Sequence, residues 1–261
     1  MSAEVAQLVE RNLAKVEAAG SNPVFRSLAT WRSGYAAVCK TVYTSSILVV
    51  ASRFIIMCGR YYNFILNDEL SYITNNELIS EFKNYNIVPS SKVAILIDNQ
   101  IVSAKWGFYP TWLKEMKDSK PLINARLETV LEKKTFKTPF EKRRCIILMS
   151  GWYEWKQEGE SKIPYAFFNE NNKLIKVAGI YSKRSDESIE TCILTKDSTS
   201  KLKNIHERMP VVLNEELLSD WNNYETDTKY LQEKLNLEIN NINYHRVDIA
   251  VNNPKNNNDN L

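Results

Sequence analysis

The chain has 261 residues, of which 44% are hydrophobic and 25% charged, so it can form an apolar core and is not a disordered polypeptide. The net charge is +3, and residues 1–56 account for all of it with six basic and three acidic side chains. The remainder is neutral, so a polyanionic partner has to be held by a local basic groove. Because no GxGxxG or Walker A sequence occurs, a dinucleotide-binding or P-loop protein is disfavoured.

Metal and membrane signals are weak in this sequence. The four cysteines are far apart without a CxxC pair, and there are only two histidines, so we expect no zinc site and no cofactor. Unpaired, widely spaced cysteines are typical of a reducing cytosol. The apolar run at residues 47–56 is half as long as the roughly 20 residues that a membrane span needs. Glu4 and Glu10 stand where a signal peptide would be basic.

Residues 1–56 differ from the rest of the chain. They show no clean helix or strand period, and Ser21-Asn22-Pro23 interrupts their one weakly helical stretch. The beginning resembles a transfer-RNA gene translated in a wrong frame. We interpret residues 1–56 as a non-native or disordered leader from a misassigned start, with the real protein beginning at Met57. A natural, poorly ordered leader is the alternative.

From Met57 onward, regular patterns follow one another. Helical spacing covers Asp68–Tyr85, and Lys92–Ile97 and Ile101–Trp106 read as a hairpin. The later elements are short helices at Leu127–Lys134 and Pro139–Arg143, a buried strand Cys145–Trp155, a hairpin of Tyr165–Phe168 with Leu174–Ile180, a strand Thr191–Thr195, helices Glu215–Asn223 and Thr228–Leu235, and a strand Ile242–Ala250. Without regular βαβ alternation, this mixture predicts an α+β fold with a largely antiparallel sheet. We expect one domain over residues 57–251 and a flexible Asn-rich tail over 252–261.

The segment Met57-Cys58-Gly59-Arg60 carries the most specific chemistry. If translation starts at Met57 and the methionine is removed, Cys58 presents an amine and a thiol on neighbouring carbons. Such a 1,2-aminothiol condenses with an aldehyde to an imine and then closes to a thiazolidine. An α-amine pKa of about 7.7–8.0 leaves a useful neutral fraction at physiological pH. Taken alone, the segment also fits a buried cysteine beside a turn.

Three further segments carry candidate polar groups. Asn124 and Arg126 lie where a loop enters a predicted helix, which suits phosphate binding or ordinary helix capping. Glu154 lies among aromatic residues at the end of a buried strand, so either its pKa is raised for proton transfer or its carboxylate reaches solvent. His206 is a general acid or base, or an inert surface histidine; we assign His245 to the inert class.

Together, the ordered segments MCGR, YNIVPSS, KWGFYPTW, INARLET, GWYEW, IHERMP and VNNPKN resemble the SOS-response-associated peptidase (SRAP) family of abasic-site processing proteins. The resemblance runs from Met57 to about Asn256. It implies a barrel-like, largely antiparallel sheet with peripheral helices and a basic cleft for single-stranded DNA. It further implies an enzyme that crosslinks covalently to abasic sites in single-stranded DNA, a monomer that needs no metal or other cofactor and touches no membrane. We then expect it in the cytoplasm, at the nucleoid when it acts on DNA.

The resemblance also implies roles for individual residues. Cys58 is the nucleophile, Asn124 orients its amine, Glu154 shuttles protons, and His206 assists sugar ring opening and crosslink reversal. Arg60 and Arg126 hold the phosphates beside the lesion, and Trp106 packs against a flanking base. Leu127 departs from the small or polar residue usual in this motif.

The leader is a more serious departure from the family, because with residues 1–56 attached Cys58 has a peptide nitrogen and can form no imine. An internal start or self-cleavage is then required, and we favour the internal start. The crosslinking enzyme is also expected to allow autopeptidase and lyase-like activity. Two alternative functions remain open: a cysteine-type peptidase or autopeptidase, and a noncatalytic single-stranded DNA-binding protein.

Overall fold

The computed structural model describes residues 41–44, 47–50, 58–64, 81–110, 113, 119–171, 173–237, 241–258 and 261. Its contacts divide the chain into two units, residues 1–56 and 57–261. In the first unit, β1 (Thr41–Thr44) pairs with β2 (Ile47–Val50) in an antiparallel manner. The helix predicted from Asp68 onward falls mostly outside the described residues, and its last positions belong to a strand.

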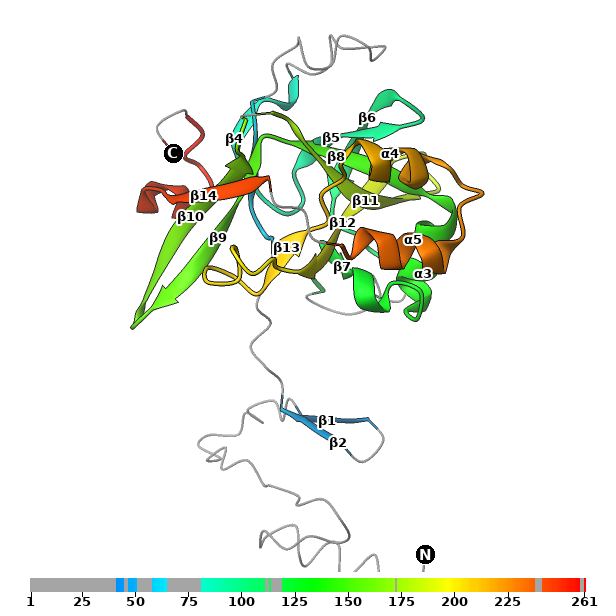
Figure 1. Cartoon of the computed structure of the whole chain (residues 1–261), viewed down its shortest axis with the longest axis horizontal. Coiled ribbons are helices and arrows are strands. Elements are labelled where there is room, and N and C mark those ends of the chain that lie inside the picture. The colour runs from blue at the N-terminus through cyan, green and yellow to red at the C-terminus, as the bar shows by residue number, and fades with distance from the viewer. Residues whose placement is uncertain are drawn as a thin grey trace, which may run out of the picture. The chain divides into compact units, whose positions relative to one another are not determined.

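Five strands of the second unit close into a barrel (Figure 1). They are β5 (Lys92–Ile97), β6 (Gln100–Trp106), β8 (Arg144–Met149), β11 (Ile175–Lys183) and β12 (Ile189–Asp197). The order is β11-β8-β5-β6-β12, and β12 pairs with β11 to complete the ring. The expected α+β fold with a barrel-like sheet is therefore confirmed. The barrel is mixed, because β12 runs parallel to β6 and to β7 (Asn124–Arg126), while β13 (Arg208–Pro210) pairs antiparallel with it.

Three helices among the described residues cover one side of the barrel (Figure 1). They are α3 (Lys134–Lys142), α4 (Glu215–Asn222) and α5 (Thr228–Leu235), with a short 3-10 turn η3 (Leu127–Thr129) before α3. Alternate strand residues such as Leu96, Leu148 and Ile180 pack with these helices in one buried cluster. This is the period of two expected for strands with one face against helices.

The residues between those positions belong to a second buried cluster, which joins the barrel to a five-stranded sheet. That sheet has the order β14-β10-β9-β3-β4. Its strands are β3 (Tyr61–Asn63), β4 (Asn84–Ile87), β9 (Gly151–Glu158), β10 (Ser161–Asn169) and β14 (Ile242–Arg246), and a 3-10 turn η4 (Ile249–Asn252) follows the last one. The stacked rings of Trp152 and Phe167, 5.1 Å apart, come from this sheet.

The single long strand predicted at Cys145–Trp155 is wrong, because the chain changes sheets at Ser150. β8 belongs to the barrel and β9 to the five-stranded sheet, with the Ser150 N–H donating to the Tyr62 carbonyl at 3.0 Å. Gly151 permits this close crossing, since a Cβ there would lie 2.1 Å from the Phe167 carbonyl oxygen. Strand composition predicted the burial but not the change of partner.

Other element boundaries also differ. The predicted hairpin of Tyr165–Phe168 with Leu174–Ile180 is wrong, since β10 and β11 lie in different sheets. The two short helices predicted before β8 are one 3-10 turn and one α-helix, and the last strand ends at Arg246 before η4. The hairpin of β5 and β6 and the bounds of α5 are confirmed.

The Asn-rich C-terminal segment is bonded to the domain, which corrects the expectation of a flexible tail. The Asn86 side-chain amide donates to the carbonyls of Val251, Asn253 and Asn256 at 2.9–3.2 Å. The Tyr85 N–H donates to Asn257 Oδ1 at 2.7 Å. In the part of the chain that the structure describes, no helix is long and apolar enough to cross a membrane.

Candidate active site

Cys58 lies three residues before the start of β3, near the beginning of the second unit, and is 2% exposed. Its backbone nitrogen donates to Glu154 Oε1 at 2.8 Å. Its φ of +45° is in the left-handed region, which a residue with a Cβ rarely adopts and which costs on the order of 1–3 kcal/mol. A strained cysteine bonded through its nitrogen to a buried carboxylate is therefore the centre of the site.

Glu154 comes from β9, opposite Tyr165 of β10, and is 2% exposed. Burial raises the pKa of its carboxyl above the ordinary value, while His206 and the hydrogen bonds with Cys58 act in the opposite direction. A raised pKa makes this carboxyl a better proton acceptor than an ordinary glutamate, which suits it to proton transfer. The predicted shift, and its cause in desolvation, agree with the structure.

His206 precedes β13 in the loop after β12, with Nε2 3.8 Å from Glu154 Oε2. Its Nδ1 lies 3.1 Å from the backbone nitrogen and 3.2 Å from the backbone carbonyl oxygen of Arg208, so it accepts from the N–H in the Nε2–H tautomer and donates to the carbonyl in the Nδ1–H tautomer. In the Nε2–H tautomer the proton-bearing nitrogen faces Glu154. The separation is longer than a direct hydrogen bond and is one that a bridging water or a small shift closes.

The thiol of Cys58 interacts with the same carboxylate as the nitrogen. Burial, the Glu154 charge and a hydrogen bond to Glu154 raise the pKa of this thiol well above its ordinary value, and only Arg208 opposes them. A cysteine peptidase needs a thiolate, which a neighbouring histidine or another cation stabilises by lowering the pKa. A thiol whose pKa is raised does not favour the thiolate and suits a reaction in which the nitrogen attacks first.

The predicted phosphate ligands differ in their surroundings. Arg126 is exposed on β7. Arg60 is half-buried, with Nη1 donating to Asn86 Oδ1 at 2.6 Å and to the Val251 carbonyl at 2.7 Å, and its guanidinium lies 5.7 Å from the Trp155 ring centre. Asn124 begins β7 opposite Ile193 of β12 and is half-buried.

The expectation that Trp106 packs against a base is wrong for this structure. Its ring is 1% exposed, lies edge-on to Tyr61 with centroids 5.1 Å apart, and donates its N–H to the Ile123 carbonyl at 3.1 Å. A base cannot stack on a ring that the core covers on both faces. Trp106 instead holds β3 against the barrel.

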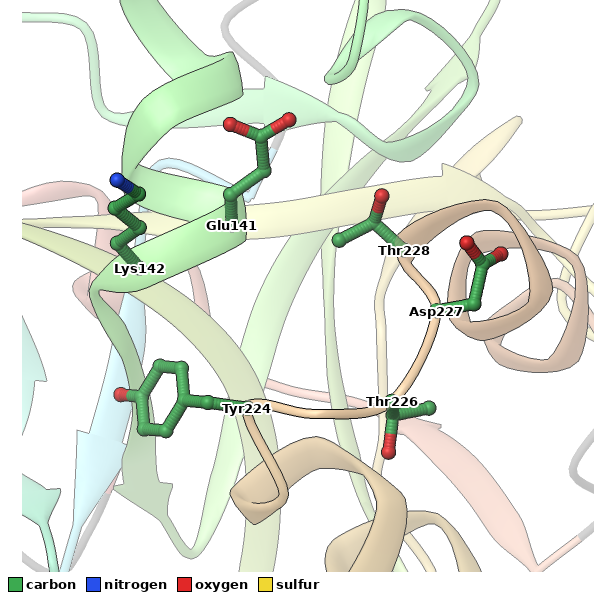
Figure 2. Close-up of a pocket in the computed structure, with 6 residues that line it drawn as sticks. All are labelled: Glu141, Lys142, Tyr224, Thr226, Asp227 and Thr228. Carbon is green, nitrogen blue, oxygen red and sulfur yellow. The ribbon is translucent and has the colours of Figure 1, made fainter.

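Among the described residues, no three His, Cys, Asp or Glu side chains are grouped as a metal site would require. An open pocket between the end of α3 and the loop joining α4 to α5 is lined by Glu141, Lys142, Tyr224, Thr226, Asp227 and Thr228 (Figure 2). None of the predicted site residues lines that pocket.

Sequence reasoning missed two charged residues inside the quoted motifs. Glu128 of INARLET and Arg208 of IHERMP form a two-point ion pair, with Nη1–Oε1 and Nη2–Oε2 distances of 2.6 and 2.8 Å. Their opposite charges in two motifs of the same series were a usable signal. Asn86 of YNIVPSS was also missed, and nothing in its composition marked it.

The family profile described as SOS response associated peptidase (SRAP) matches residues 57–254. Abasic site processing protein YoqW of Bacillus subtilis is 33% identical over 216 residues, covering 77% of this chain and 96% of its own length. YedK of Escherichia coli, an abasic site processing protein, is 30% identical over 77% of this chain and 96% of its own length. HMCES of Rattus norvegicus is 31% identical over 67% of this chain and 63% of its own length. The chain belongs to the SRAP family.

Solved structures agree with this fold. A protein from Bacteroides thetaiotaomicron superposes with a TM-score of 0.65 at 23% identity, covering 76% of this chain and 95% of that one. A phage-related protein from Bordetella bronchiseptica superposes with a TM-score of 0.57 at 26% identity, covering 73% and 94%. The barrel joined to a five-stranded sheet is therefore an architecture shared with crystal structures.

Proposed function

We propose that this protein processes abasic sites in single-stranded DNA by bonding covalently to them through Cys58. The observation that carries the proposal is the 2.8 Å hydrogen bond from the Cys58 nitrogen to Glu154, with His206 Nε2 at 3.8 Å from the other carboxylate oxygen. The names of YoqW, YedK and HMCES, all abasic site processing proteins, support the substrate.

The chemistry begins at the Cys58 nitrogen once Met57 is removed. The free amine attacks the aldehyde carbon of the ring-opened abasic sugar, and the carbinolamine loses water to give an imine. Glu154 takes the proton from the amine and returns it to the leaving hydroxyl. The Cys58 sulfur then adds to the imine carbon while its proton passes to the nitrogen, which closes the thiazolidine without any oxidant or reductant.

Residues 1–56 have to be absent from the active form under this proposal, by an internal start at Met57 or by cleavage. The backbone of Cys58 supports such a form, because an N-terminal residue has no preceding carbonyl and hence no strained φ. Removal of Met57 therefore both creates the amine and relieves the left-handed conformation.

Substrate positioning is assigned to the remaining residues. We propose that Arg126 and Arg60 hold the phosphates beside the lesion, with Arg60 fixed by the Val251 carbonyl and Asn86. Asn124 orients the amine and the ring formed from it. His206 protonates the sugar oxygen during ring opening and assists reversal. The protein acts as a monomer on DNA in the cytoplasm.

The test compares two chains, one beginning at Met57 and one at Met1, each mixed with single-stranded DNA containing one abasic site. Intact mass first establishes whether the shorter chain begins at Cys58. We expect that chain to give an adduct that survives denaturation, with the mass of protein plus DNA minus one water. Undamaged DNA of the same sequence gives none.

Two substitutions separate the amine from the thiol. Cys58→Ser keeps the amine, so it forms an imine that borohydride traps but no thiazolidine. Cys58→Ala behaves in the same way, and acetylation of its amine abolishes trapping. A Met57-start protein that retains DNA only under native conditions is a noncatalytic binder. Cleavage of an added peptide that depends on Cys58, without an adduct, makes it a peptidase.

A further inference from the structure

Arg208 is held by several polar partners at once. Its guanidinium makes the two-point pair with Glu128, a second ion pair with Asp197, and a 2.8 Å hydrogen bond to the Thr195 carbonyl. Asp197 is also its cross-strand partner between β12 and β13. Partial burial acts to raise the pKa of Glu128, but the hydrogen bonds from Arg208 outweigh it and hold that pKa below its ordinary value. The pair is therefore ionised at neutral pH.

The backbone of the same arginine fixes the site histidine. The Arg208 N–H donates to His206 Nδ1 at 3.1 Å, and the Arg208 carbonyl lies 3.2 Å from the same nitrogen. Behind it, the Ser198 N–H donates to the Glu207 carbonyl at 2.9 Å and closes the loop. If the N–H of Arg208 moves, the neutral ring has the Arg208 carbonyl as its alternative partner and turns its proton to Nδ1.

We propose that Glu128 and Arg208 act together as positioning residues that keep the His206 ring in its Nε2–H form and directed at Glu154. The ion pair between Glu128 and Arg208 fixes the start of β13, and the backbone N–H of Arg208 selects the tautomer of His206. Glu128 follows β7, which carries Asn124 and Arg126. The ion pair therefore also connects the segment proposed to bind phosphate to the loop that carries His206. The role of His206 itself rests on the proposed function.

The first test needs no DNA. The chain has two histidines, so a ¹⁵N-histidine-labelled Met57-start protein gives one set of ring signals for His206 and one for His245, which is exposed on β14 and serves as the internal reference. This part of the chain corresponds to 96% of the length of YoqW, which supports its folding without residues 1–56. We expect an unprotonated Nδ1 in the wild type.

Glu128→Gln is the mild perturbation, because the Glu128 side chain is 38% exposed and its amide keeps the shape. We expect the Nδ1–H form of His206 to increase about fivefold relative to the Nε2–H form, the change that accompanies loss of roughly one hydrogen bond. Glu132→Gln, an exposed carboxylate in the same segment, is the matched control and leaves the ratio unchanged. An unchanged ratio in both Glu128→Gln and Arg208→Lys overturns the proposal.

The second test measures single-turnover crosslinking against pH, together with affinity for a DNA carrying a tetrahydrofuran analogue that cannot react. We expect Glu128→Gln to slow crosslinking about tenfold to a hundredfold at saturating DNA and to displace the pH profile, with affinity within twofold of the wild type. If Glu128→Gln instead changes affinity alone, Arg208 is a phosphate ligand and the proposal is wrong. A wild type that forms no adduct refutes the proposed function, and the tautomer ratio still decides the positioning role.

Discussion

Replacing Glu154 by glutamine removes one exchangeable proton site from the centre of the candidate site while keeping its shape. The carboxylate lies 2.8 Å from the Cys58 nitrogen and 3.8 Å from His206 Nε2, and no comparable carboxylate approaches either group among the described residues. An amide can still accept a hydrogen bond but cannot relay a proton. We expect crosslinking to slow by roughly a hundredfold to a thousandfold, which is about 2.7–4 kcal/mol of activation free energy.

The same substitution, which slows the reaction, should not lower the stability of the fold above neutral pH. Because burial raises the pKa of Glu154, the folded state holds its proton more tightly than the unfolded chain does. The free energy of unfolding therefore falls as pH rises from the ordinary glutamate range through the raised pKa. Glutamine has no such titration, so at pH 8 the variant should be at least as stable as the wild type.

The assay is a pH series of thermal unfolding alongside single-turnover crosslinking for the chain beginning at Cys58. Glu158→Gln, at the exposed end of the same strand, is the control and should match the wild type in both. If Glu154→Gln crosslinks within threefold of the wild type, proton transfer does not pass through this carboxyl. A variant that is both slow and less stable at pH 8 has lost structure instead.

Four further substitutions test the fold around the site, Gly159→Ala being the control for Gly151→Ala. Gly151→Ala should destabilise the folded protein by about 3 kcal/mol or more, since the new Cβ would lie 2.2 Å from Tyr62 Oη. Gly159→Ala has open space around the new Cβ, so its only cost is the φ of +58°, roughly 1–2 kcal/mol. Thermal unfolding of the two variants checks this order. Asn86→Ala removes the side-chain donor of the Asn253 and Asn256 carbonyls and leaves the Val251 carbonyl with Arg60 alone. It should cost about 2 kcal/mol, visible as a lowered unfolding midpoint and faster proteolysis of the C-terminal segment. Trp106→Ala should cost about 3–5 kcal/mol by opening a cavity, with affinity per folded molecule for the tetrahydrofuran DNA unchanged; a selective loss of affinity would restore the base-stacking role.

Local patterns predicted the local elements of this fold well. The hairpin of β5 and β6 is confirmed because its turn residues, Asp98 and Asn99, both take the positive φ that such turns require. The bounds of α5 are confirmed because Asp227 caps it, accepting the N–H groups of Lys229 and Tyr230. The division of one apolar run between two sheets at Ser150 could not be read from sequence, since both strands are equally buried there and their partners lie far along the chain.

In the candidate site, too, sequence could suggest which residues matter but not how each one is placed. The family resemblance assigned roles to Cys58, Glu154 and His206, which residue chemistry alone had left open, and the structure brings all three together. Burial could not be inferred for Trp106, because an indole suits a core and a base-stacking surface equally. Arg208 was missed because its effect passes through its own backbone N–H, which every residue but proline carries.

Hydrogen bonds join the C-terminal segment of the second unit to the residues around Cys58 and Glu154. Val251 accepts a hydrogen bond from Arg60, two positions after Cys58, and Asn252 accepts one from Trp155, next to Glu154. A late stop codon or a bulky C-terminal fusion therefore acts at the beginning of the folded unit, on the segment that carries Cys58, the proposed nucleophile. Affinity tags for this protein therefore belong on a cleavable linker after Leu261, where they leave these hydrogen bonds intact.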